Sequence, residues 1–113
     1  MEKSKMFAIE IVNLVKRLEL KKEYILSKQI LRSGTSIGAN VAEANFAQSK
    51  ADFISKISIA QKEAAETIYW LELLFETKYI ENEEFEKLIN LNKEILRLLS
   101  KILITARINL SKK

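Results

Sequence analysis

Only two glycines and no proline occur in these 113 residues, and the two glycines lie four residues apart, at Gly34 and Gly38. The residues around them continue a helical pattern, so the pair does not mark a turn. Glycine inside a helix costs roughly 0.5–1 kcal/mol relative to alanine. We therefore interpret the pair as positions where the missing side chains let a second helix approach closely, by the steric logic of small-residue packing.

Apolar residues recur at helical spacing in four stretches, residues 4–19, 23–46, 50–76 and 82–109. Alternating strand patterns are absent. Ser49 with Asp52 resembles a capping box, and Asn82 is a candidate N-cap. Four amphipathic helices joined by short loops predict an all-α domain spanning residues 1–113, an antiparallel up-down-up-down four-helix bundle.

Each predicted helix has one apolar stripe that we expect to face the core. The stripes consist of Phe7, Ile11, Leu14, Val15 and Leu18; Leu26, Ile30, Ile37, Val41 and Ala44; Phe53, Ile57, Ala60, Ala64, Ile68, Leu71 and Phe75; and Phe85, Leu88, Asn92, Leu96, Leu99, Leu103 and Ala106. Arg107, Lys112 and Lys113 stand at the C-terminal end of the last helix, where the helix dipole favours cations.

The composition argues against an enzyme. The chain has no cysteine and no histidine, which removes thiolate chemistry, the commonest general base and the commonest transition-metal ligand. A short-looped bundle also offers no cleft for a catalytic pair. Neither a signal peptide nor a membrane-spanning run is recognisable, which predicts a cytoplasmic protein. We expect no cofactor and no bound metal.

Carboxylates gather at Glu43, Glu63 and Glu66. The di-iron pattern of helical bundles needs Glu-x-x-His on two helices, so a metal site is not expected here. We expect Glu63 and Glu66 to pair with Lys62, an arginine or helix-terminal groups.

Basic residues form a stripe on the last predicted helix, where Lys93, Arg97 and Lys101 follow at intervals of four. Lys28 and Arg32 add charge near the start of the second helix, and the net charge is +4. Such a stripe is typical of nucleic-acid binding. The alternative is a solvated helix face.

A polar row on the second helix contains Arg32, Ser36, Asn40 and Glu43. By projection the row falls opposite the apolar stripe of that helix. It could bind phosphate or ribose through the Arg fork and the Ser and Asn donors. The alternatives are a solvated face and a polar interface with another subunit.

More apolar surface is present than one small bundle needs. Ile59, Trp70 and Leu73 on the third helix and Leu98 on the fourth fall outside the main stripes, and Ile95 also broadens the fourth stripe. Excess apolar area on a small protein usually marks a partner surface. We expect self-association, with scattered exposed apolar residues as the alternative.

Two segments resemble a known family. These are residues 29–44, Gln-Ile-Leu-Arg-Ser-Gly-Thr-Ser-Ile-Gly-Ala-Asn-Val-Ala-Glu-Ala, and the downstream pattern of Phe53, Ile59-Ala60, Lys62-Glu63-Ala64, Glu66-Thr67 and Tyr69-Trp70-Leu71. Both are similar to segments of the 23S ribosomal RNA intervening-sequence proteins. The likeness covers residues 7–108. It implies a four-helix bundle that assembles as a homopentamer. It also implies kinship with the accessory variability protein of diversity-generating retroelements, a basic pentameric barrel that works with a reverse transcriptase and nucleic acid.

The sequence thus leads to one hypothesis and one alternative. The hypothesis is a non-enzymatic, self-assembling bundle that binds structured RNA or DNA through its basic face. The alternative is a protein-interaction scaffold, for example an accessory subunit for a polymerase or reverse transcriptase. In the alternative, the polar row and apolar residues such as Trp70 matter more than the basic residues.

Overall fold

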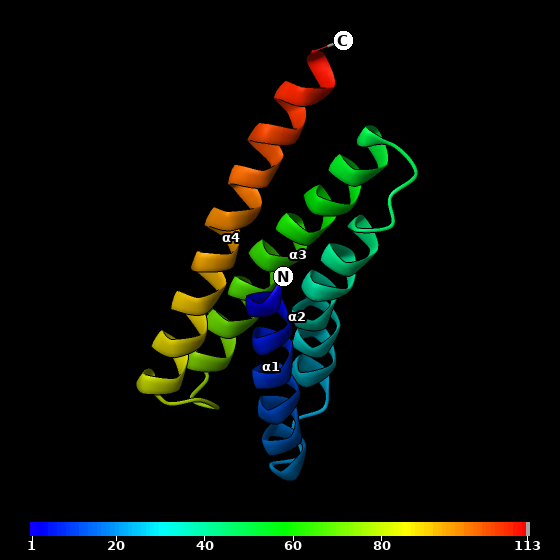
Figure 1. Ribbon diagram of the computed structural model, residues 1–113. Coiled ribbons are helices and arrows are strands. Elements are labelled where there is room, and N and C mark those ends of the chain that lie inside the picture. The colour runs from blue at the N-terminus through cyan, green and yellow to red at the C-terminus, as the bar shows by residue number, and fades with distance from the viewer. Residues whose placement is uncertain (113) are drawn as a thin grey trace.

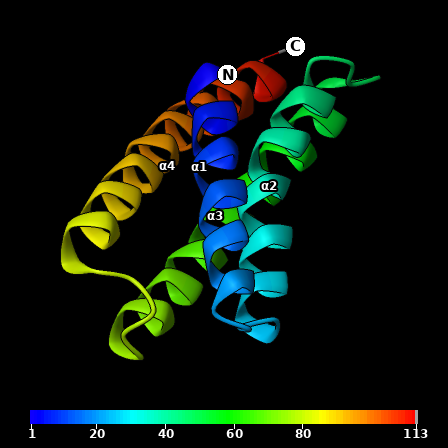
Figure 2. The same cartoon turned by 90° about the horizontal axis from the view of Figure 1, so that it is seen from below.

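Four long helices run alternately up and down (Figure 1). The computed structural model describes residues 1–112, so Lys113 lies outside the described residues. The helices are α1 (Glu2–Leu20), α2 (Ile25–Ala44), α3 (Lys50–Glu76) and α4 (Asn82–Ser111). Each helix packs on its neighbours in sequence, and α1 also meets α4, so that α1 lies between α2 and α4 (Figure 2). The result is a rod of 54 × 22 × 20 Å, which confirms the predicted all-α four-helix bundle.

The two tight turns close without glycine. After α1, the Lys22 N–H donates to the Glu19 carbonyl at 2.9 Å, and the Glu23 N–H donates to the Leu18 carbonyl at 2.9 Å. After α3, Lys78 and Tyr79 repeat the same pair of bonds. This is the Schellman arrangement, which requires a left-handed residue after the helix. Lys22 (φ 63°) and Lys78 (φ 68°) fill that position, so both turns carry a side chain where glycine is usual.

Side chains define the starts of α2 and α3. The Asp52 N–H donates to Ser49 Oγ at 3.0 Å, which confirms the predicted cap. The Asp52 carboxylate accepts from the Gln48 N–H at 3.2 Å, one residue before the partner that a capping box uses. At α2 the carboxylate of the buried Glu23 accepts the N–H groups of the first helical residues, from Ile25 to Ser27. The α2 helix therefore begins at Ile25, two residues later than predicted.

At α4, Asn82 is the first helical residue, and Glu81 is the N-cap, without a side-chain capping bond. The prediction of Asn82 as N-cap was therefore wrong by one position.

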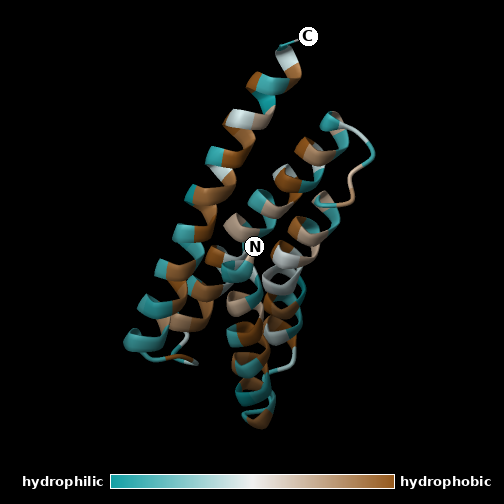
Figure 3. Cartoon of the chain, viewed as in Figure 1, coloured by the Kyte–Doolittle hydropathy of each residue, from teal (hydrophilic) through white to brown (hydrophobic). Residues whose placement is uncertain are grey.

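One continuous core fills the space between the four helices, and the apolar face of each helix turns toward it (Figure 3). The predicted stripe of α1 is buried throughout. Ile95, expected to broaden the α4 stripe outward, is fully buried instead, because α4 packs against both α3 and α1 and its buried arc is wide. Thr67 and Leu74 of α3 are also buried, although neither was in the predicted stripe.

The glycine pair lies where α2 crosses α1, as the sequence predicted. A Cβ at Gly34 would lie 3.0 Å from both γ carbons of Ile11, tighter than normal contact, whereas a Cβ at Gly38 would lie 3.4 Å from the Ser4 carbonyl oxygen. A side chain at Gly34 therefore requires Ile11 to shift by a few tenths of an ångström, whereas Gly38 leaves room for a methyl group.

Candidate nucleic-acid interface

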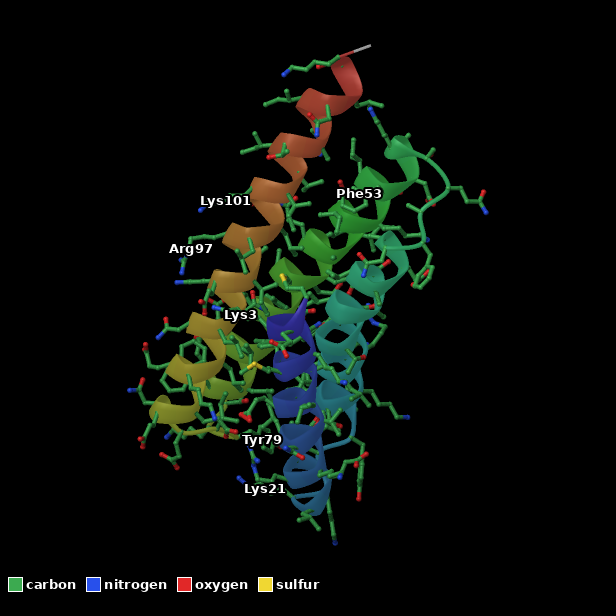
Figure 4. All side chains as sticks on the ribbon, in the orientation of Figure 1. Lys3, Lys21, Phe53, Tyr79, Arg97 and Lys101 are labelled. Atoms are coloured by element: carbon green, nitrogen blue, oxygen red, sulfur yellow. The ribbon has the colours of Figure 1, made fainter. Side chains whose placement is uncertain are left out.

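The basic stripe lies on the outer face of α4. Lys93, Arg97 and Lys101 are all exposed, and Arg97 and Lys101 are labelled on the outer edge of α4 in Figure 4. Within the described residues, none of the three forms an ion pair. Successive members are about 6 Å apart along the helix, so the stripe extends over about 12 Å.

The charge of α4 is divided along its length. Glu81, Glu83, Glu84 and Glu86 surround its start, whereas no aspartate or glutamate occurs from Ile95 to the end of the sequence. The one carboxylate within the stripe, Glu94, forms an ion pair with Lys3 of α1. The C-terminal half of α4 is therefore a cationic surface without internal neutralisation.

Arg32 does not join this surface. Its guanidinium donates to Glu63 Oε2 at 3.1 Å and also forms an ion pair with Glu66. The Trp70 indole N–H donates to the same Glu66 oxygen at 2.9 Å. The carboxylates thus pair with an arginine, one of the partners predicted from the sequence, and Arg32 joins α2 to α3.

A buried hydroxyl pair lies beside this ionic cluster. Thr67 Oγ1 is 2.8 Å from Ser33 Oγ and 2.8 Å from the Glu63 carbonyl oxygen. Each hydroxyl has one proton, so Thr67 donates to the carbonyl while Ser33 donates to Thr67. The pair satisfies two fully buried polar side chains across the α2–α3 interface.

The polar row on α2 borders the apolar face of that helix, and the predicted position opposite the face was wrong. Glu43 lies 3.5 Å from Lys56 of α3, and Asn40 Nδ2 donates to the Ser36 carbonyl at 2.8 Å within α2. With Arg32 also bound to α3, both ends of the row are used inside the subunit. A projection of α2 alone could not show which neighbour would cover this side.

Lys28 is exposed on α2. Helices α2 and α4 are diagonal in the bundle and share no contact. The structure therefore brings Lys93, Arg97 and Lys101 together, and it leaves Lys28 and Arg32 on another side of the rod.

The four apolar residues predicted to form an oligomer interface also lie on two different helices. Ile59, Trp70 and Leu73 share one face of α3 by helical spacing. Ile59 is exposed and Leu73 is half-buried, while Trp70 is half-buried and packs against the core. Leu98, also half-buried, belongs to α4. Three of the four residues thus form one surface, here called the α3 outer face.

The described residues contain neither a metal-binding cluster nor a membrane-spanning helix. Within residues 1–112, no group of three or more carboxylates is arranged to hold a metal ion. Among the four described helices, none combines the length and apolarity that crossing a membrane requires.

This chain is similar to known proteins in its sequence and in its fold. No curated protein matches it. A solved structure from Bacteroides thetaiotaomicron VPI-5482, described as a protein with unknown function from the S23 ribosomal protein family, is 58% identical, with a TM-score of 0.88, over 90% of this chain and 95% of that chain. The family model of the 23S rRNA-intervening sequence protein matches residues 1–101. The resemblance found in the sequence is thereby confirmed, and the chain belongs to the 23S rRNA-intervening sequence protein family.

Proposed function

We propose that the protein is a non-enzymatic, self-assembling bundle of the cytoplasm that binds structured RNA or DNA through the basic stripe of α4. The observation that carries the proposal is this stripe of Lys93, Arg97 and Lys101, which is exposed and forms no ion pair within the described residues. No carboxylate follows Glu94 on α4. Cations held in a row on a rigid helix suit a row of phosphates, because each one replaces a condensed counterion. Arg32 is not part of this surface, since Glu63 and Glu66 already neutralise it.

Salt dependence gives the first test. Three phosphate contacts predict a slope of about −2.7 in log affinity against log salt concentration for duplex DNA. We would measure fluorescence anisotropy with an RNA hairpin and a DNA duplex between about 50 and about 200 mM salt. Absence of binding to either probe at low salt would disprove the proposal.

Matched variants give the second test. Changing Lys93, Arg97 and Lys101 to glutamine should flatten the slope by nearly three units and weaken binding more than about 100-fold near 0.1 M salt. The control changes Lys5, Lys16 and Lys62 to glutamine, since these exposed lysines on α1 and α3 also form no ion pair among residues 1–112. The control removes the same charge, so equal losses in both variants would mean that net charge alone attracts the nucleic acid.

Self-assembly is the second part of the proposal, with a homopentamer as the expected state from the family resemblance. The supporting observation is the α3 outer face, where Ile59 retains 39% of its surface. Burial of this face between copies would repeat the basic stripe around the assembly and raise avidity. Light scattering should give about five times the chain mass. A monomer at tens of micromolar would contradict this part, as would an unchanged mass in the folded variant Ile59→Asp.

A further inference from the structure

Helix α1 is too short to cover α4. At about 1.5 Å per residue, the 19 residues of α1 span about 28 Å and the 30 residues of α4 about 45 Å. The ion pairs between them, Arg17–Glu84, Glu10–Lys87 and Lys3–Glu94, end near the middle of α4. In Figure 1 the N-terminus lies partway along the rod, while α3 and α4 continue beyond it.

A groove follows where α1 stops. It has a volume of about 410 Å³ and is lined by Phe53 of α3 and by Lys101, Ile102, Thr105, Ala106 and Asn109 of α4. Lys87, Glu94 and Lys101 are seven residues apart, so the groove continues the side of α4 that α1 covers lower down. Over the last turns of α4 the bundle thus has three helices, and the groove lies where α1 would continue as the fourth.

The floor of the groove is apolar surface that belongs to the core stripe. Phe53 continues the row of Ile57, Ala60 and Ala64, which are 2% exposed or less, yet Phe53 itself is only half-buried. Phe53 lies beside the α4 residues from Lys101 to Asn109, beyond Glu94, where the ion pairs of α4 with α1 end. Figure 4 labels Phe53 near the start of α3 and Lys101 on the neighbouring part of α4.

The charged residues beside the groove indicate which kind of helix would fit into it. Along the α1-facing side of α4 the charged positions are Glu84, Lys87, Glu94 and then Lys101, and the first three have opposite charges from α1 as partners. Lys101 is the next position and has no ion-pair partner within the described residues. Lys50 borders a second depression beside the same groove, and no carboxylate occurs on α4 beyond Glu94. An occupant complementary to this edge has an apolar stripe and carboxylates.

We propose that this groove, lined by Phe53 and the last turns of α4, docks an acidic amphipathic helix of another protein, which completes the four-helix bundle. A second copy of this chain is a poorer occupant, because each of its four described helices is packed in its own core and none is free to enter the groove as a separate helix. The free length of α4 beyond Glu94 accepts a helix of about 16 residues.

The test uses a designed helical peptide of about 16 residues, with leucines on one face and glutamates beside them, labelled for fluorescence anisotropy. A second peptide has lysine in place of each glutamate. We expect the acidic peptide to bind and the basic peptide to bind at least about tenfold more weakly. Lys101→Glu should reverse this preference. Binding of neither peptide, or equal binding of both, would overturn the proposal.

A substitution that fills the groove distinguishes peptide binding in the groove from binding to the basic stripe. Thr105 is exposed, so Thr105→Trp should fold, as a thermal melt would verify, and should abolish binding of the acidic peptide. The double change Lys93→Gln and Arg97→Gln should leave peptide binding within about twofold and weaken nucleic-acid binding. If Thr105→Trp leaves peptide binding intact, or if it lowers the oligomeric mass of the protein alone, the groove is not a docking site for a foreign helix.

Discussion

The contact between Gly34 and Ile11 yields the sharpest prediction about stability. A Cβ at Gly34 would lie 3.0 Å from Ile11 Cγ1, 3.0 Å from Cγ2 and 3.3 Å from Cβ. Rotation of Ile11 about its first side-chain bond replaces one γ carbon by the β hydrogen, but it moves that carbon into the surrounding core. Ile11 is fully buried, so relief requires the core around Ile11 to rearrange or α1 to move away from α2.

The magnitude follows from two opposing terms. Replacing a helical glycine by alanine gains about 1 kcal/mol of helix propensity. Overpacking a filled core costs typically about 1–3 kcal/mol. The second term is larger at Gly34, so Gly34→Ala should destabilise the protein by about 1 kcal/mol. At Gly38 the new methyl group makes ordinary contact with Ser4, so Gly38→Ala should stabilise the protein by about 0.5–1 kcal/mol.

Urea unfolding of both single variants measures the difference, which should be about 1.5–2 kcal/mol. A double-mutant cycle with Ile11→Ala identifies the cause, because the cost of Gly34→Ala should vanish when the γ carbons are absent. If Gly34→Ala proves as stabilising as Gly38→Ala, or if the cycle shows no coupling, the close approach of α1 and α2 is not what excludes a side chain.

Three further changes test other features. Within residues 1–112, neither amide atom of the buried Asn92 has a hydrogen-bond partner, so the similarly branched Asn92→Leu should raise the free energy of unfolding by about 1–3 kcal/mol. A lower free energy of unfolding of the variant in a denaturant titration would contradict this. Lys78→Gly relieves a left-handed lysine and should add about 0.5–1 kcal/mol, which a higher urea midpoint would report. Gly38→Leu extends beyond the room for one methyl group and should lower the melting temperature and disturb assembly, unlike Gly38→Ala, so an unchanged melt and mass would contradict it.

The sequence predicted the number, type and approximate extent of the helices because each helix buries one stripe at helical spacing. Helix α3 was predicted at Lys50–Glu76 and is found there. The start of α2 was less predictable, because Glu23, predicted as the first residue of the helix, instead precedes it and caps its first N–H groups. The type of the two tight turns could not be predicted either, because lysine and not glycine occupies both left-handed positions.

The candidate site was only partly predictable for a different reason. A helical projection ranks the residues of one helix by direction but does not say which neighbour lies in that direction. The stripe of Lys93, Arg97 and Lys101 is defined within α4 alone, so the sequence was sufficient to group it. The role of Arg32 could not be predicted without the position of α3, because Glu63 and Glu66 of that helix neutralise it.

The ionic cluster also changes the interpretation of the family motif. Arg32 and Ser33 come from the α2 segment that carries the family resemblance, while Glu66, Thr67 and Trp70 come from the α3 segment, and these residues bind one another. The most recognisable residues are therefore accounted for by contacts between two helices of one subunit. A partner has to be sought where charge and apolar surface are left without internal partners. Besides the α3 outer face, such a place is the C-terminal part of α4, where the basic stripe and the open fourth-helix position adjoin at Lys101.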